Sequence, residues 1–244
     1  MKRSLWIIIL LLAVIGVGAT WWLLRSSPHD EALAARELAT RKLAEYLARK
    51  FPGHRAIVVS NPFTQRDGVA REILAMEKAG VAGVRAGLGR RARVEAVVFP
   101  ELKPEAQLDP RAVFIDAETT TPLSYLVAED AFDKLISQHP NCDVVISLVG
   151  LPARLDRVRC WTDERPKFAL LLPDLRPVGN TAAVKQAVVS GKLAAFVLYR
   201  PDTAELSKVA GPLRFEDRFL LVTAENIEQI LTDYPQLFPT ETHR

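Results

Sequence analysis

The sequence predicts a doubly wound α/β domain with a mainly parallel sheet of six or seven strands, preceded by one transmembrane helix and an amphipathic helix. Short runs of apolar, often β-branched residues lack polar alternation, as in strands buried on both faces, and they alternate with stretches of helical composition. A third feature, an uncharged N-terminal segment, predicts the membrane span.

The N-terminal segment has the length and the flanks of a membrane anchor. Leu5–Leu24 contains no charged residue, and as a helix it would be about 30 Å long, the thickness of a bilayer's hydrocarbon core. Tryptophans near both ends suit the two membrane interfaces, and Lys2 and Arg3 keep the N-terminus in the cytoplasm by the positive-inside rule. We therefore predict a signal anchor at 1–25 and a single-pass protein of the cytoplasmic (inner) membrane, with an extracytoplasmic, periplasmic domain.

A cleaved signal peptide is the alternative for this segment. Val17–Ala19 offers small residues for cleavage after Ala19, and Leu5–Ile15 would form the hydrophobic region. The apolar run continues through Trp21–Leu24 beyond that cut, which favours the uncleaved anchor. Both interpretations export the rest of the chain.

Residues 26–52 predict a tether followed by an amphipathic helix. Asp30–Phe51 is rich in strong helix formers, and Pro52 and Gly53 end it. Apolar residues, Leu38 and Leu43 among them, recur at helical spacing and form one stripe. We expect the stripe to pack on the following domain; pairing with a partner protein is the alternative.

The α/β domain is predicted to occupy residues 53–238, with a flexible tail at 239–244. Strands are predicted at Ala56–Ser60, Val94–Phe99, Asp143–Val149, Phe168–Leu172, Leu193–Tyr199 and Phe219–Thr223, with a minor strand at Val113–Ile115. Helices are predicted at Asp67–Leu88, Ala128–Gln138, Thr181–Val189 and Ala224–Tyr234.

Two segments resemble a lobe of the type I periplasmic-binding-protein fold, which is Rossmann-like. They are the helix–Ser-Gly–strand unit Lys185–Pro201 (KQAVVSGKLAAFVLYRP) and the passage Phe132–Pro152 (FDKLISQHPNCDVVISLVGLP). The resemblance rests on pattern and implies a fold without a specific family. It implies no particular ligand-binding residues.

Ligands of open parallel sheets bind beyond the carboxyl ends of the strands, which selects the candidate site. The loop after the first strand offers hydroxyl and amide groups near the start of a helix, where backbone N–H groups favour an anion. Loops after later strands carry a glycine and two aspartates. The predicted ligand-binding residues are Ser60, Asn61, Thr64, Gly150, Asp174 and Asp202. Turn formation and helix capping are the structural alternatives for Asn61, Thr64, Asp174 and Asp202.

The cysteines and a segment rich in glycine and arginine give less specific predictions of function. Cys142 and Cys160 are a disulfide candidate in an exported domain, with two buried free thiols as the alternative. The glycines at 80, 83, 87 and 89 are expected to loosen and end a helix. The nearby arginines at 85, 90, 91 and 93 form a solvated face or, alternatively, contact anionic headgroups.

Charge and motifs narrow the function. Three of the 32 basic residues lie within 1–25, where no acid occurs, so 29 basic side chains face 29 acidic ones in the rest of the chain. A neutral domain lacks the field that attracts nucleic acid. No metal-ligand spacing, cofactor motif or nucleophile elbow is present, so we predict no metal, no cofactor and no catalytic residue.

The leading hypothesis is a membrane-anchored, non-catalytic module that binds a small ligand or an envelope protein. A structural or assembly component of a membrane complex is the second hypothesis. An enzyme with an unrecognised site is the third.

Overall fold

The computed structural model describes residues 27–201 and 213–240 as one α/β unit. Its sheet consists of β1 (Arg55–Val59), β2 (Arg93–Val98), β3 (Val144–Ser147), β4 (Lys167–Leu171), β5 (Leu193–Tyr199) and β6 (Phe219–Thr223). Its helices are α2 (Pro28–Lys50), α3 (Arg71–Leu88), α4 (Pro104–Leu108), α5 (Leu123–Leu126), α6 (Ala131–Gln138), α7 (Arg159–Thr162), α8 (Thr181–Val189), α10 (Phe215–Arg218) and α11 (Ile227–Asp233).

The sheet confirms the predicted α/β class. Its strand order is β2-β1-β3-β4-β5-β6. The first five strands are parallel, and β6 pairs antiparallel to β5. The predicted minor strand at Val113–Ile115 is wrong, because these residues follow a short 3-10 helix and pair with no strand. The sheet therefore has six strands within the described ranges.

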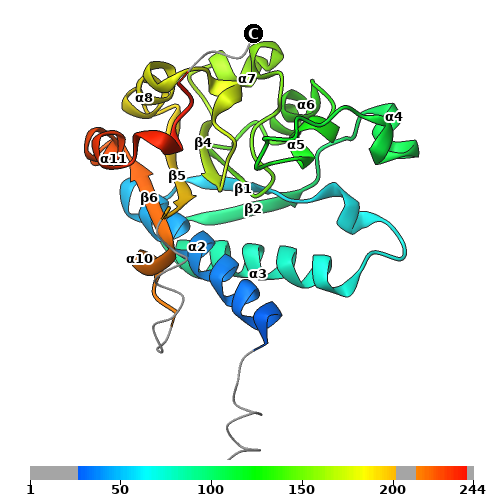
Figure 1. Ribbon diagram of the computed structural model, residues 1–244, viewed down its shortest axis with the longest axis horizontal. Coiled ribbons are helices and arrows are strands. Elements are labelled where there is room, and N and C mark those ends of the chain that lie inside the picture. The colour runs from blue at the N-terminus through cyan, green and yellow to red at the C-terminus, as the bar shows by residue number, and fades with distance from the viewer. Residues whose placement is uncertain (1–26, 202–212, 241–244) are drawn as a thin grey trace, which may run out of the picture.

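Helices cover both faces of the sheet (Figure 1). On one face, Val58 and Ile146 of the central strands pack with α2 and α3. On the other face, Ile57 and Val145 pack with α6, α8 and α11. Neighbouring residues on a strand point to opposite faces, so strands buried on both faces must be apolar throughout. This is why the strands read as continuous apolar runs.

The apolar stripe of α2 lies inside the domain, as predicted. Leu43 is fully buried and Leu38 partly buried, both among residues of the α2–α3 side of the core. The alternative in which this stripe pairs with a partner protein is therefore wrong. Ser27 caps the helix, since its hydroxyl accepts from Asp30 N–H and the Asp30 carboxylate accepts from Ser27 N–H.

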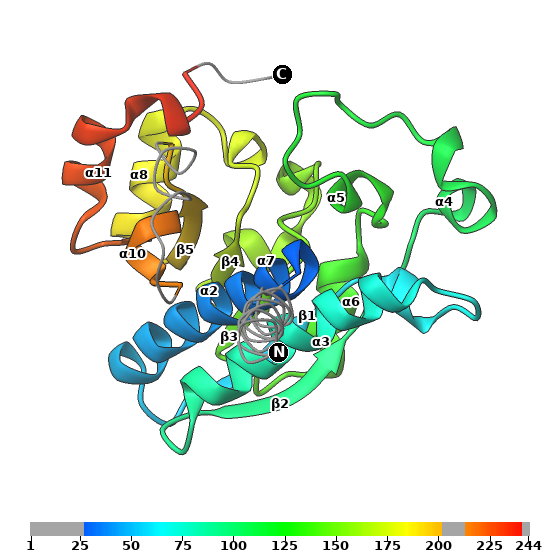
Figure 2. The ribbon, with the colours of Figure 1, turned by 60° about the horizontal axis from the view of Figure 1, so that its bottom comes forward.

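Glycines of α3 allow the close contact between α2 and α3, which run side by side in Figure 2. A Cβ at Gly83 would lie 2.2 Å from the carbonyl oxygen of Glu37, and a Cβ at Gly87 would lie 2.3 Å from that of Arg41. These glycines therefore sit where the two backbones touch. The expectation that they loosen the helix is wrong for positions 80, 83 and 87, which lie within α3; Gly89 does end it, with a φ of 54°.

Two expectations concern the membrane and the cysteines. In the part of the chain that the structure describes, no helix is long and apolar enough to cross a membrane, and the predicted span at 5–24 lies outside that part. Cys142 and Cys160 are free and buried, so the disulfide candidate is corrected to two separate thiols. The Cys142 thiol donates to the carbonyl of Val144, and the backbone of Cys160 is bound by Asp133.

Candidate ligand site at the carboxyl edge of the sheet

The strand order defines a switch point. From β1 the chain crosses to β2 on one side, then returns to β3 on the other side of β1. In doubly wound folds this divergence opens a crevice beyond the carboxyl ends of the two central strands. The loops after β1 and β3 contain the predicted residues Ser60, Asn61, Thr64 and Gly150.

Ser60, Asn61 and Thr64 form one hydrogen-bonded group with Glu77 of α3. The Ser60 hydroxyl donates to Glu77 Oε2 over 2.6 Å, and Arg36 of α2 binds Glu77 Oε1 over 2.7 Å. The Asn61 side chain accepts from the Phe63 N–H, which caps a 3-10 turn, while the Thr64 hydroxyl donates to the Asn61 carbonyl. The capping alternative therefore holds for Asn61. Ser60, Thr64 and Glu77 also line a cavity of about 420 Å³ between α3 and β2.

Gly150 lies where the switch-point crevice would open, but protein atoms fill that space. Its φ of 84° favours glycine, and its carbonyl accepts from the Ser147 hydroxyl over 2.6 Å. A Cβ at this position would lie 2.9 Å from the methyl carbon of Thr121. Thr121 and Ser124 are buried. The connection between β2 and α6 therefore covers the carboxyl end of β3.

Arg176 links the connection between β2 and α6, which we call the covering segment, to the loop after β4. Its guanidinium binds Asp174 Oδ2 over 2.6 Å and Asp116 Oδ2 over 2.9 Å. The Thr119 hydroxyl adds a bond of 2.8 Å to Asp174. Burial acts to raise the pKa of Asp174, but the hydrogen bonds from Arg176 and Thr119 outweigh it, so this pKa lies below its usual range. The hydrogen bond to Asp174 raises the pKa of Arg176, and both groups stay charged.

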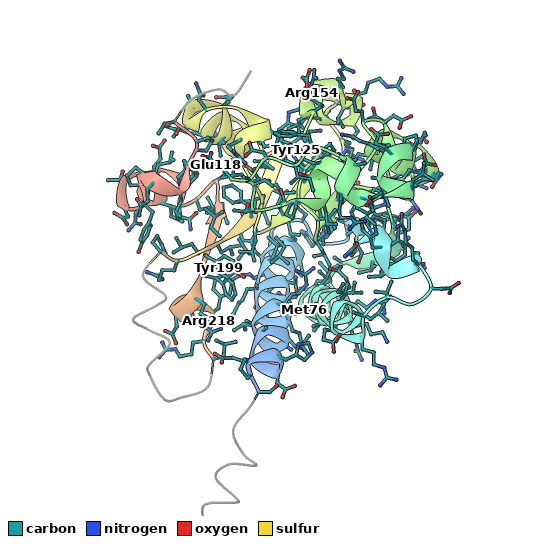
Figure 3. The ribbon with its side chains drawn as sticks, turned by 45° about the vertical axis from the view of Figure 1, so that its right-hand side comes forward. Met76, Glu118, Tyr125, Arg154, Tyr199 and Arg218 are labelled. Atoms are coloured by element: carbon teal, nitrogen blue, oxygen red, sulfur yellow. The ribbon has the colours of Figure 1, made fainter. Side chains whose placement is uncertain are left out.

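A cavity of about 530 Å³ opens beside this ion-pair cluster. It is lined by the covering segment and by the loops after β3 and β4: Asp116, Tyr125, Ala153, Arg154, Leu155, Asp156, Arg176, Pro177, Val178 and Gly179. Figure 3 shows Glu118, Tyr125 and Arg154 on the same side of the molecule, away from Met76 of α3. We call this space the upper cavity.

The upper cavity combines paired charges with one open hydroxyl. Arg154 binds Asp156 through two contacts of 3.0 Å, and Arg176 binds both Asp116 and Asp174, so each charged group of the lining has a partner of opposite charge. Tyr125 is half-buried, and its hydroxyl has no hydrogen-bond partner among the described residues. Burial, and then the charge of Asp116, raise the pKa of Tyr125, which keeps the phenol protonated.

The predicted residues do not form a single site. Ser60 and Thr64 line the cavity beside α3, Asp174 supports the upper cavity through Arg176, and Gly150 lies between them under Thr121. Asp202 lies outside the described residues. Sequence reasoning missed Arg176, which binds Asp116 sixty residues earlier in the chain, and Tyr125, which lines the upper cavity. Within the described ranges no group of three or more His, Cys, Asp or Glu side chains could hold a metal ion.

Known proteins match the chain through its fold alone. No protein-family model and no curated protein matches the chain. The solved structures that match include periplasmic sugar-binding proteins, which confirms the predicted resemblance to the type I periplasmic-binding-protein fold.

Three of these structures show the extent of the likeness. One is a protein from Mycobacterium smegmatis, with 13% identity and a TM-score of 0.49 over 84% of this chain and 63% of that chain. A fructose-binding periplasmic domain of a hybrid two-component system has 12% identity and a TM-score of 0.48 over 84% and 61%. A solute-binding protein from Actinobacillus succinogenes with bound D-allose has 10% identity and a TM-score of 0.46 over 80% and 62%. The chain spans less than two thirds of the length of each.

Proposed function

We propose that the chain is a membrane-anchored, extracytoplasmic, non-catalytic module that binds a small neutral polar ligand in the upper cavity. The observation that carries the proposal is a cavity of about 530 Å³ at the carboxyl edge, whose paired charges surround an open tyrosine hydroxyl. Small-molecule sites in doubly wound folds lie at this edge and have comparable volumes.

The charges of the lining select the class of ligand. Arg154 pairs with Asp156, and Arg176 pairs with Asp116 and Asp174. A charged ligand would compete with one of these pairs, whereas a neutral ligand with hydroxyl groups can bind their remaining donors and acceptors. The Tyr125 ring supplies an apolar surface and a hydroxyl at its end. Polyhydroxyl compounds fit this combination.

The cavity supports binding better than catalysis. Asp174 and Asp116 already bind Arg176, and Asp156 binds Arg154, so each carboxylate is held as an ion-pair partner. A general base near neutral pH needs a raised pKa and access to a substrate proton. Asp174 has a lowered pKa instead. These features favour a binding site.

The exported location rests on the N-terminal sequence. Leu5–Leu24 has the length of a membrane span, and Lys2 and Arg3 favour a cytoplasmic N-terminus. Three residues, 25–27, separate this predicted span from α2, which begins at Pro28. The domain would therefore lie close to the periplasmic surface of the membrane in which it is anchored.

Thermal unfolding of the full chain in detergent tests the binding proposal. We would screen neutral polyols, including fructose and D-allose, because both are small, uncharged and rich in hydroxyl groups. A ligand that binds only the native state at 100 times its Kd stabilises it by about 2.7 kcal/mol, which for a chain of this size raises the Tm by roughly 5–10 °C.

Matched variants localise the effect. Tyr125→Phe and Arg154→Ala should weaken binding, since both residues line the upper cavity. Arg157→Ala is the control, because this neighbouring exposed arginine binds Glu129 and is not part of the lining. The proposal fails if no neutral compound shifts the Tm, or if both cavity variants respond like the native chain.

A further inference from the structure

The cavity of about 420 Å³ between α3 and β2 is separate from the upper cavity, and the two share no lining residue. β2 is the outermost strand of the described sheet, and Figure 1 shows α3 running alongside it. Because α3 approaches α2 closely through Gly83 and Gly87, its opposite side leaves a space next to β2. We call this space the edge cavity. An inference about it is independent of the proposed function.

Apolar side chains form most of the wall of the edge cavity. They come from α3 and from the end of β2: Leu74, Val81, Ala82, Val97 and Phe99. Leu74 and Phe99 are half-buried, yet they belong to no apolar cluster of the described core. Their apolar surface therefore lies at the cavity wall and not in the packed interior.

The edge cavity is long and narrow. Its residues on α3 run from Leu74 to Arg85, a distance of about 16 Å along the helix axis. A volume of about 420 Å³ spread over this length corresponds to a mean width of about 5 Å. A single hydrocarbon chain fits this width, because carbon atoms in contact lie about 4 Å apart. The paired chains of a phospholipid do not fit.

Two basic side chains lie at the rim of the edge cavity. Lys78 and Arg85 are exposed, and neither makes an ion pair or a hydrogen bond with another described residue. They follow one stripe of α3 with Val81 between them, about 10 Å apart along the axis. Both side chains are long and flexible, so their charged ends can meet at one anionic group above Val81.

Glu77 is the one carboxylate of the cavity lining, and it does not cancel this charge. Its Oε1 is bound by Arg36 over 2.7 Å, and its Oε2 accepts from the Ser60 hydroxyl over 2.6 Å. The carboxylate is thus already paired with a cation outside the lining. The two cations at the rim therefore leave the edge cavity with a net positive charge.

We propose that the edge cavity binds a fatty acid, with its carboxylate at Lys78 and Arg85 and its hydrocarbon chain between α3 and β2. The width of the cavity selects a single chain, and the unpaired cations select an anionic end. Each methylene group moved from water into the cavity strengthens binding about fourfold. Most of the affinity therefore comes from the chain, and the two cations supply the specificity for the carboxylate.

Photoaffinity labelling of the full chain in detergent tests the inference. The probe is a medium-chain fatty acid that carries a diazirine on its chain, and the matched probe is the corresponding fatty alcohol, which has the same chain and no charge. Peptide mass spectrometry then locates the labels. We expect saturable labelling of α3 and β2 by the acid, and loss of this labelling in excess decanoate. Labels on residues 5–24 would report probe in the micelle and are left out of the comparison.

A space-filling variant shows whether the chain of the probe lies in the cavity. Ala82→Phe introduces a ring at an exposed position of the lining, so the fold tolerates it. It should lower labelling by the acid at least about fourfold, the contribution of one methylene group. Ala86→Phe is the matched control, because Ala86 is also an exposed alanine of α3 and lies outside the lining.

Charge variants show whether the carboxylate is recognised. Lys78→Gln and Arg85→Gln should each lower labelling by the acid about two- to fivefold, the range for an exposed charge pair. They should leave labelling by the alcohol unchanged. Arg71→Gln is the control, since Arg71 is an exposed arginine of the same helix outside the lining. Comparing each variant with the native chain for the same probe removes the effect of partition into the detergent.

Three results would overturn the inference. The first is the absence of saturable labelling on α3 and β2. The second is labelling by the acid that Ala82→Phe and Ala86→Phe change equally. The third is a pair of charge variants that lower labelling by the acid and by the alcohol to the same extent, or lower neither. All of these variants lie outside the upper cavity, so their failure would leave the proposed function intact.

Discussion

Replacing Gly83 by alanine tests how α2 and α3 hold the domain together. The new Cβ would lie 2.1 Å from the Thr40 hydroxyl oxygen and 2.2 Å from the Glu37 carbonyl oxygen. Thr40 can rotate, although its hydroxyl already donates to the carbonyls of Arg36 and Glu37. The Glu37 carbonyl belongs to the backbone of α2 and cannot rotate away. The two helices must therefore separate by about 1 Å, which loses dispersion energy along the whole contact.

The size of the effect follows from two opposing terms. Overpacking costs about 1–3 kcal/mol, and a rigid backbone obstacle places this case near the top of that range. Alanine in a helix is favoured over glycine by about 1 kcal/mol, which offsets part of the cost. The net loss of unfolding free energy is about 2 kcal/mol, a fall in Tm of roughly 4–8 °C for a chain of this size.

Thermal unfolding of the full chain in detergent, followed by circular dichroism, measures this loss. Gly80→Ala is the matched control, because its Cβ would meet the flexible ends of Arg36 and Leu148 at 3.0 and 3.1 Å. These side chains can shift, so the control should unfold within about 2 °C of the native chain. A Gly83→Ala chain as stable as the native protein would refute the backbone-contact account of these glycines.

Three further predictions follow from the charges, the thiols and the anchor. The pKa of Asp174 is lower in the folded state, so the contribution of its carboxylate to the free energy of unfolding is complete above about pH 4 and is lost as the pH falls further. Asp174→Asn should therefore lower the urea midpoint at neutral pH and flatten the decline of that midpoint in acid. An unchanged decline would contradict this. Burial raises the pKa of Cys142 to about 11 and of Cys160 to about 12, so maleimide should label both slowly in the native chain and rapidly in urea. An intact mass lighter by two hydrogen atoms would instead reveal a disulfide. An alkaline phosphatase fused after Arg244 should be active, since the predicted anchor exports the domain; activity only of a cytosolic reporter would reject that topology.

The fold was readable from the sequence because the strands are buried on both faces. Ile57 packs on one side and Val58 on the other, so both had to be apolar, and the run was recognisable as a strand. The stripe on α2 was readable because its buried apolar residues recur at helical spacing. The role of Gly83 was not, because a glycine that ends a helix and a glycine that admits a second backbone look the same in one sequence.

The candidate site was readable only in outline. Strand ends directed the prediction to the carboxyl edge of the sheet, where the upper cavity lies, and Asp174 was selected there. Its partner Arg176 binds Asp116, sixty residues earlier in the chain, and no local pattern reports a pairing across that distance. Glu77 reads as an ordinary helical acid, although it binds Ser60 at the end of β1. Long-range pairs of this kind depend on the folded topology.

Native mass spectrometry of the full chain, released from mild detergent after purification from its own host, tests the ligand-binding claim most directly. We predict a small neutral adduct on the native chain that is reduced or lost in Arg154→Ala and retained in Arg157→Ala. A native chain without any adduct, even after incubation with neutral polyols, would contradict the claim, as would an adduct equally abundant in both variants.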